Sequence, residues 1–354
     1  MYEGQTVGVV VTAYNEEGLV GRVIETMPEF VDRVYAIDDG STDGTWNEIL
    51  EHADHVECED AERPSNERPA PTPTPGTGAG MVTDGSGYAT SVPFVLGIKH
   101  AQNRGYGATV KTGYRHAHGD RMDVVAVMNG DGQMAPEELR RIIDPVVGGR
   151  ADYAKGDRMR TRDSREGMSG FRFVGNAALT IMTKFSSGYW KMNDSQNGYT
   201  AISLEALDRI PYESLYDEYG FLNDTLTTLN IHGRRVANVS HRAVYGEEDS
   251  SIRLRRFVPR VSVLLARNFV RRLKTRYLVV DFHPVILCYL FGVFGLLATL
   301  LSAAAAVALP LTPVEGFFAA VLTTLLFVAT GTVLSVGIAF DVEQNRQLEL
   351  VLDE

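Results

Sequence analysis

Two residues that follow an apolar run, Asp131 and Gln133, have side chains that can bind a metal ion. They lie in residues 124–139, VVAVMNGDGQMAPEEL, where the run VVAVM gives way to NGDGQ and then to PEEL, a favourable start for a helix. Because they flank Gly132, an extended backbone would point both side chains the same way. A carboxylate and an amide oxygen on one side suit a hard divalent cation such as Mg²⁺ or Mn²⁺. The alternative is a strand-to-helix turn in which Asp and Gly only shape the backbone.

Carboxylates also follow two earlier apolar runs. Residues 6–12, TVGVVVT, lead into AYNEEG, and residues 34–37, VYAI, lead into Asp38 and Asp39 of DDGSTDGT. Carboxylates at a strand end accept hydrogen bonds from base N–H groups and sugar hydroxyls, so these motifs predict contacts to a nucleotide or a sugar. Because the fingerprint G-x-G-x-x-G is missing after the first run, we do not expect a dinucleotide site.

A structural role is open for the end of the second motif. Asp43 or Thr42 can cap the helix expected over residues 46–53, as short polar side chains do at helix starts. This role does not involve Asp38 or Asp39, so capping and ligand binding are compatible.

These residues are positioned by strands that alternate with helices up to about residue 245. Strands are expected at residues 6–12, 34–37, 94–99, 124–128 and 152–155, and helices at 19–27, 46–53, 105–118, 136–147 and 172–185. The alternation predicts one α/β domain with a mainly parallel sheet over residues 1–250. Such a sheet gathers the carboxyl ends of its strands at one edge, where open α/β folds bind their ligands.

Residues 59–93 interrupt this pattern. They contain ERPSNERPAPTPTPGTGAG and show little hydrophobic periodicity. A segment of this composition cannot bury enough apolar surface to fold compactly, so we expect a flexible surface insertion without chemistry.

The charge of the chain limits its partners. The net charge is -11, so a nucleic-acid partner is not expected. Residues 251–282 are nevertheless strongly basic, with interleaved Leu, Val and Phe. This pattern predicts amphipathic helices that lie at a membrane surface.

Two apolar segments follow the basic stretch, at residues 284–309 and 313–340, and each exceeds the ~20 residues needed to cross a bilayer. A pair of buried core helices is the alternative, but neither segment shows a polar face. We therefore expect two transmembrane helices within residues 283–341 and a tail over residues 342–354 of a multi-pass protein of the cell membrane. Basic residues before the first span place the α/β domain in the cytoplasm, and a second span returns the tail there.

The order and spacing of five motifs, TAYNEE, AIDDGSTDGT, NRGYGATVKTG, MNGDGQMAPEEL and DSQNGYTA, resemble the family-2 inverting glycosyltransferases with a GT-A fold. Within that family the chain is most similar to the dolichyl- or polyprenyl-phosphate mannose and glucose synthases. The resemblance extends over nearly all of residues 5–255 apart from the insertion, and the two apolar segments resemble the anchors of membrane-bound members. It implies a Rossmann-like GT-A catalytic domain, a nucleotide-sugar donor and a divalent metal, Mg²⁺ or Mn²⁺.

The resemblance also implies roles for individual residues. Those expected to bind the nucleotide sugar are Tyr14, Glu16, Asp38, Asp39, Asn129, Gly130, Asp131 and Arg253. Those expected to bind the acceptor phosphate are Arg158, Arg172 and Asn176; the metal ligands are Asp131 and Gln133, and the catalytic residues are Asp131 and Asp194. Two positions depart from the family pattern: Ala13 replaces a frequent Pro, and Asn129 replaces the first Asp of the D-x-D motif.

The acceptor remains open between two kinds. A polyprenyl or dolichyl phosphate, whose second pKa is about 6, is an anion at neutral pH and needs only positioning, for which Arg158 and Arg172 are suited. A sugar hydroxyl of a lipid-linked glycan needs a general base, for which Asp194 is the candidate.

We expect the first reaction, transfer of a hexose from a UDP- or GDP-linked sugar to membrane lipid phosphate, which supplies lipid-linked sugar for glycan or glycoprotein assembly. The basic stretch 251–282 would hold the site against the bilayer, where such acceptors lie. A non-enzymatic membrane module that only binds its ligand is a third possibility, and Asn129 is the feature that favours it.

Overall fold

The computed structural model describes residues 1–59, 81–83, 89–91, 94–158, 170–241 and 254–352. They divide into two compact units. The first comprises Met1–Asn268 and Leu348–Glu354, and the second comprises Phe269–Gln347.

Within the described residues, the first unit is built on a nine-stranded sheet with the strand order β11-β10-β8-β9-β7-β1-β2-β6-β3. Only β9 runs antiparallel to its neighbours among these described strands. The sheet therefore confirms the predicted α/β fold with mainly parallel strands. Its strands are β1 (Val7–Ala13), β2 (Arg33–Asp38), β3 (His55–Glu59), β6 (Phe94–His100), β7 (Val124–Asn129), β8 (Tyr153–Asp157), β9 (Thr200–Ser203), β10 (Val236–Ser240) and β11 (Glu349–Leu352).

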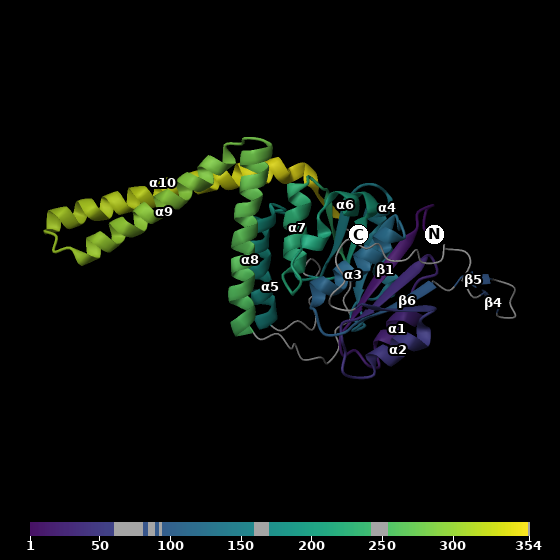
Figure 1. The fold of residues 1–354 in the computed structure, drawn as a ribbon. Coiled ribbons are helices and arrows are strands. Elements are labelled where there is room, and N and C mark those ends of the chain that lie inside the picture. Colours follow the sequence, from purple (N-terminus) through teal and green to yellow (C-terminus); the bar gives the residue numbers. More distant parts are fainter. Residues whose placement is uncertain (60–80, 84–88, 92–93, 159–169, 242–253, 353–354) are drawn as a thin grey trace. The chain divides into compact units, whose positions relative to one another are not determined.

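Helices cover both faces of this sheet (Figure 1). One face packs against α1 (Val20–Glu25), α2 (Thr45–His52) and α4 (Leu139–Val147), which continues a short 3-10 turn at Pro136–Glu138. The other face packs against α3 (Tyr106–Gly119), α6 (Leu204–Arg209) and α7 (Phe221–Ile231). Burial on both faces explains why β1, β2 and β7 read as continuous apolar runs, since every side chain of such a strand enters the core.

The strand register gathers the acidic motifs at one edge of the sheet. Within the parallel strands β7, β1 and β2, Thr12 pairs with Asn129 and Ala13 pairs with Asp38. The last residues of β7 and β2 therefore flank the last residues of β1. The loops that follow these three strands start from adjacent points.

Most of the insertion expected over 59–93 lies outside the described residues. Two short segments are described, β4 (Met81–Thr83) and β5 (Ala89–Ser91), and they pair antiparallel. The prediction that this segment is flexible is therefore not tested by the structure.

The C-terminal residues differ from the expected tail over 342–354. Glu349–Leu352 forms β11, which extends the sheet by pairing parallel to β10. Leu350 and Leu352 pack against the hydrophobic core, and β10 offers an open edge of backbone donors and acceptors. A four-residue strand carries too little periodicity to be recognised in the sequence, so this pairing was missed.

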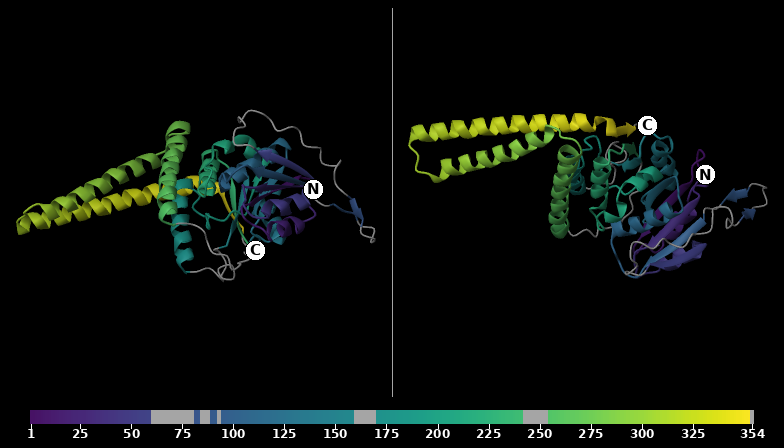
Figure 2. Two further views of the ribbon diagram at one scale, coloured as in Figure 1. Left: turned by 60° about the horizontal axis from the view of Figure 1, so that its bottom comes forward. Right: turned by 45° about the horizontal axis from the view of Figure 1, so that its top comes forward.

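The second unit contains two long apolar helices, α9 (Val285–Ala308) and α10 (Pro313–Asn345), joined by a short link (Figure 2). Both are long and apolar enough to cross a membrane. Glycines bring the two helices close, because a methyl group added at Gly292 would overlap Leu334 and one at Gly295 would overlap Thr330. Small residues at a helix contact are typical of packing within a bilayer.

A buried ion pair holds the base of this second unit together. The Arg272 guanidinium donates to both carboxylate oxygens of Asp341, at 2.7 and 2.8 Å, and both side chains are fully buried. The Tyr277 hydroxyl and the Asn345 amide donate to the same carboxylate at 2.6 and 3.0 Å. Arg272 belongs to α8 (Leu254–Lys274), which continues as a π-helical turn over Thr275–Val280. The pair thus fixes the end of α8 to α10 within this unit.

Candidate functional site

The segment after β7 forms a turn and not the extended backbone that we expected. Gly132 has a φ of +71°, and the Asp131 carboxylate accepts a hydrogen bond from the Gln133 backbone N–H at 3.0 Å. This local bond closes an Asx turn, which competes with an extended chain. The argument that both side chains point the same way because the chain is extended is therefore wrong. The assignment of Asp131 and Gln133 as metal ligands remains a prediction.

The two carboxylates at the end of β2 have different surroundings. Asp38 is fully buried and accepts from the Ser41 N–H at 2.9 Å through one oxygen. Its other oxygen accepts no hydrogen bond from the described residues, although the Lys99 ammonium lies 3.9 Å away. A buried carboxylate oxygen in this state can accept a ligand N–H or O–H.

Asp39, in contrast, is occupied by the protein itself. Its carboxylate accepts from the backbone N–H groups of Arg104 and Gly105, both at 2.9 Å. The His100 ring contacts the same carboxylate at 2.7 Å. Asp39 therefore fixes the turn that starts α3, and its predicted contact to the nucleotide would have to be made in addition to these bonds.

The loops after β1 and β2 are tied together at this edge. Asn15 has a φ of +56°, and its backbone N–H donates to the Ser41 hydroxyl at 2.9 Å. The Glu16 N–H donates to the Thr45 hydroxyl at 2.7 Å. Tyr14, which precedes them, leaves 45% of its surface exposed. An exposed ring at a fixed loop is well placed to stack on a nucleotide base.

The motif DSQNG meets the ends of β7 and α3 at Gly198. A methyl group added there would lie 2.6 Å from the Tyr106 hydroxyl and 3.3 Å from the Asn129 side-chain oxygen. The Tyr106 hydroxyl is buried without a hydrogen-bond partner among the described residues. Gly198 is thus the residue whose small size lets these three motifs meet.

Gly198→Ala is expected to lower the activity that the sequence resemblance implies, sugar transfer, by about tenfold or more, because overpacking at this junction costs roughly 1–3 kcal/mol. Adding Tyr106→Phe removes the oxygen that the new methyl group would strike, so the double variant should recover part of the lost activity. The measurement is kcat/KM for both variants and for Tyr106→Phe alone. Equal activity of Gly198→Ala and the wild type would show that the junction is looser than described.

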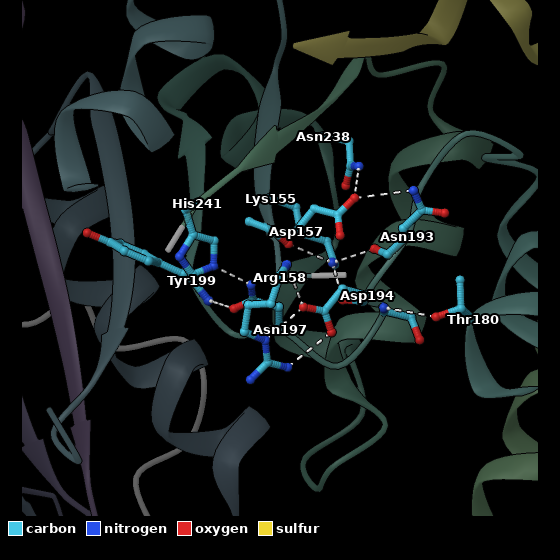
Figure 3. Close-up of polar contacts among 12 residues, drawn as sticks. Lys155, Asp157, Arg158, Thr180, Asn193, Asp194, Asn197, Tyr199, Asn238 and His241 are labelled. Atoms are coloured by element: carbon cyan, nitrogen blue, oxygen red, sulfur yellow. Dashed lines mark hydrogen bonds and ion pairs between the residues drawn. The ribbon is translucent and has the colours of Figure 1, made fainter. Parts of the chain in front are cut away.

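A second group of polar residues surrounds Asp194 (Figure 3). The Arg158 guanidinium donates to both carboxylate oxygens of Asp194, at 2.8 and 3.0 Å, and the Arg158 backbone N–H donates at 3.0 Å. Asp194 is fully buried, whereas the Arg158 side chain is 20% exposed. The two residues for which we expected separate roles, a catalytic carboxylate and a phosphate ligand, therefore form one bidentate pair.

This pair changes the acidity of Asp194. Burial by itself raises the pKa of the carboxyl, but the Arg158 guanidinium, with help from Lys155, outweighs it and brings the pKa to about 2. A carboxylate with so low a pKa, whose oxygens already accept three hydrogen bonds, is a weak general base at neutral pH. The arrangement favours a role for Asp194 in orienting Arg158.

Several polar residues of this group were missed in the sequence. The Asp157 carboxylate accepts from the Asn238 amide at 2.6 Å and from the Asn193 amide at 3.2 Å. The Asn197 amide lies 2.6 Å from the His241 ring. Lys155 is buried in the middle of β8. The sequence offered one sign of this group, a lysine and an aspartate within a buried strand, since buried charges are rare unless paired.

The structure does not describe the side chains of three predicted site residues. Arg172 and Asn176 fall within α5 (Gly170–Ser187), close to the helix start expected near residue 172, but their side chains lie outside the described atoms. Arg253 lies outside the described residues. Within the described parts of the chain, no group of three or more His, Cys, Asp or Glu side chains could hold a metal ion.

Comparison with known proteins identifies a family and several relatives. The sequence model of glycosyl transferase family 2 matches residues 8–69 and 86–211. The chain is 24% identical over 240 residues to a UDP-N-acetylglucosamine–dolichyl-phosphate N-acetylglucosaminyltransferase of Methanococcus voltae, covering 68% of this chain and 86% of that protein. It is 27% identical over 217 residues to a polyprenol monophosphomannose synthase of Mycolicibacterium smegmatis, covering 60% of this chain and 67% of that protein.

Among solved structures, the chain is similar to glucosyl-3-phosphoglycerate synthase from Mycobacterium tuberculosis. The complex of that enzyme with Mn²⁺, uridine diphosphate and phosphoglyceric acid has a TM-score of 0.48 and 16% identity, covering 76% of this chain and 78% of the other. A complex of the same enzyme with Mg²⁺ and uridine diphosphate has a TM-score of 0.47 and 17% identity, covering 76% of this chain and 79% of the other.

Proposed function

Because the chain belongs to glycosyl transferase family 2, and its α/β domain has the GT-A fold, we propose that this glycosyltransferase moves a hexose from a UDP- or GDP-linked sugar to a membrane polyprenyl or dolichyl phosphate. The observation that carries the proposal is the bidentate pair of Arg158 and Asp194. It presents a fixed, partly exposed guanidinium and leaves Asp194 a weak base. Such a site suits an acceptor that is already an anion. The names of the two relatives, one of which contains dolichyl-phosphate and the other polyprenol monophosphomannose, support the same acceptor class.

The donor binds at the edge formed by the ends of β1, β2 and β7. Asp38 accepts a hydrogen bond from the nucleotide through its unoccupied oxygen, and Tyr14 stacks on the base. Glu16, Asp39, Asn129 and Gly130 line the same edge, and Arg253 is proposed to contact the diphosphate. The nucleoside diphosphate is the leaving group.

Asp131 and Gln133 are proposed to hold a Mg²⁺ or Mn²⁺ ion. A carboxylate and an amide oxygen suit an ion that takes its other ligands from water and substrate phosphate oxygens. When bound, the ion offsets the negative charge that develops on the leaving diphosphate.

The acceptor phosphate is oriented by Arg158, with Arg172 and Asn176 proposed as further contacts from α5. One phosphate oxygen attacks the anomeric carbon from the side opposite the leaving group, so the carbon–oxygen bond forms with inversion. The lipid phosphate has a second pKa of about 6 and loses no proton in this step at neutral pH. No general base is needed, which is consistent with the pKa of about 2 at Asp194.

The membrane holds the acceptor, and α8, α9 and α10 are proposed to hold the enzyme there. The basic helix α8 also carries apolar side chains that are open to their surroundings, with Val263 70% and Val270 62% exposed. Such a helix binds an anionic membrane surface. We propose that α9 and α10 cross the bilayer, with the α/β domain and the C-terminus in the cytoplasm.

The test is a panel of radiolabelled nucleotide sugars given to the purified full chain with Mg²⁺ or Mn²⁺. One arm supplies bare polyprenyl or dolichyl phosphate in vesicles, and the other supplies a lipid-linked glycan. The proposal expects labelled lipid in the first arm. Product in the second arm alone would favour glycan extension with Asp194 as general base, and no turnover with any donor would favour a module that only binds ligand.

A further inference from the structure

Lys155 carries a buried charge and has no role in the proposed reaction as described above. It is the third residue of β8, and none of its surface is exposed. Its ammonium donates to the backbone carbonyls of Gly156 at 3.1 Å, of Asn193 at 2.9 Å and of Asp194. An ammonium has three N–H donors, so this geometry uses each of them once.

Two of these carbonyls belong to the loop that carries Asp194. The Asp194 backbone is in the left-handed region, with a φ of +46°, which a non-glycine residue adopts only when its surroundings hold it there. The ammonium holds the backbone at Asn193 and Asp194, and the Asp194 carboxylate in turn holds the Arg158 guanidinium. Lys155 and Arg158 therefore lie at opposite ends of one chain of bonds (Figure 3).

We propose that protonated Lys155 is a positioning residue for the acceptor-phosphate site, because its three hydrogen bonds hold Asp194 and thereby the guanidinium of Arg158. This inference rests on the proposed function, since it assigns a cause to the geometry of the same acceptor site. Lys155 does not touch the substrate in this scheme.

The surroundings make the charge of Lys155 sensitive to pH. Burial lowers its pKa to about 8, against the opposing effect of the Asp194 and Asp157 carboxylates and with a smaller contribution from Arg158. Among the described residues, the other titratable groups near this cluster include Lys184 on α5, which bonds the Asn193 side chain at 3.1 Å and interacts with the Glu349 carboxylate of β11. His241 after β10 bonds Asn197.

Loss of the proton would break the arrangement in a defined way. A neutral amine has two N–H donors and a lone pair, so one of the three carbonyls would face a lone pair instead of a donor. The loop would then lose part of its hold on the left-handed Asp194. The acceptor phosphate itself does not change its charge in this range, because its second pKa is about 6.

The experiment measures KM for polyprenyl phosphate and for the nucleotide sugar, with the full chain in vesicles, from about pH 7 to about pH 9.5. Acceptor KM is expected to rise by up to about tenfold per pH unit above the Lys155 pKa of about 8, with donor KM unchanged. A Lys155→Met variant should have a raised acceptor KM that no longer depends on pH.

Lys184→Met is the matched control, because burial also lowers the pKa of Lys184 and its ammonium reaches the same loop. This variant should keep the rise of acceptor KM with pH. Thermal unfolding and binding of the nucleoside diphosphate establish that each variant is folded, and the wild-type pH profile tests the inference without any substitution.

A wild-type acceptor KM that stays flat to pH 9.5, or a rise that survives in Lys155→Met, overturns the role of Lys155 and leaves the proposed function standing. If acceptor KM no longer rises with pH in Lys184→Met, the effect belongs to Lys184, and the proposed role of Lys155 is also overturned. Absence of transfer to lipid phosphate at every pH overturns the proposed function itself, and this inference with it.

Discussion

Asp131→Asn should lower the kcat of sugar transfer by at least about a hundredfold. The Asn side chain keeps an oxygen that can accept the Gln133 N–H, so the turn after β7 survives, whereas the negative charge required by Mg²⁺ or Mn²⁺ is lost. A bound metal contributes several kcal/mol by stabilising the charge on the leaving diphosphate, which corresponds to that factor or more. The same variant, loaded with nucleoside diphosphate, should bind Mn²⁺ more weakly when the ion is followed by electron paramagnetic resonance.

Asp43→Asn is the matched control for this substitution. Asp43 closes a similar turn after β2, where its carboxylate accepts from the Thr45 N–H at 3.1 Å, and it has no proposed contact to metal. Its replacement should change kcat by no more than about threefold, as is usual for surface positions. If Asp131→Asn behaves like this control, then Asp131 serves the turn alone and the metal assignment fails.

Replacing Asp194 with Asn should raise the acceptor KM about a hundredfold while kcat at saturating acceptor stays within about tenfold of the wild type. Asn cannot form the bidentate ion pair, and breaking a buried pair costs roughly 3–5 kcal/mol, of which acceptor binding carries a part. Arg158→Lys should have the same kind of effect, since an ammonium does not reproduce the two parallel bonds of a guanidinium. The measurement is the full dependence of rate on lipid phosphate at fixed donor.

Asp120→Asn controls for loss of a buried ion pair as such. Asp120 binds the buried guanidinium of Arg33, away from the Asp194 loop, so its replacement should lower thermal stability and leave the acceptor KM unchanged. If Asp194 is instead a general base, its replacement is expected to change kcat and not the acceptor KM. Loss of a base lowers kcat by about 10²–10⁴ and leaves acceptor KM nearly constant, and that pattern would exclude the positioning role.

The architecture of the α/β domain could be predicted because burial on both faces leaves a clear trace in the sequence. Most residues of β1, β2 and β7 are apolar, and each strand leads into a polar motif. The motifs were expected to lie near one another because the carboxyl ends of parallel strands lie at the same edge of a sheet. The two long apolar helices could be predicted for a similar reason, since their length and composition alone identify them.

The bonds within the candidate site could not be predicted in the same way. Arg158 and Asp194 are separated by 36 residues, and no periodicity links a strand end to a loop residue. The turn at Gly132 depends on one positive φ, which the sequence permits but does not require. β11 depends on an open strand edge that exists only once the sheet has formed.

The most direct test of the central claim follows the acceptor phosphorus by ³¹P nuclear magnetic resonance during turnover in vesicles. Transfer to lipid phosphate converts a phosphomonoester, whose resonance titrates with a pKa of about 6, into a phosphodiester that does not titrate near neutral pH. We predict that the monoester signal is replaced by a non-titrating diester signal as nucleoside diphosphate accumulates in equal amount. Release of nucleoside diphosphate with transfer of the labelled sugar to a glycan, while the lipid phosphomonoester signal stays unchanged, would contradict the account.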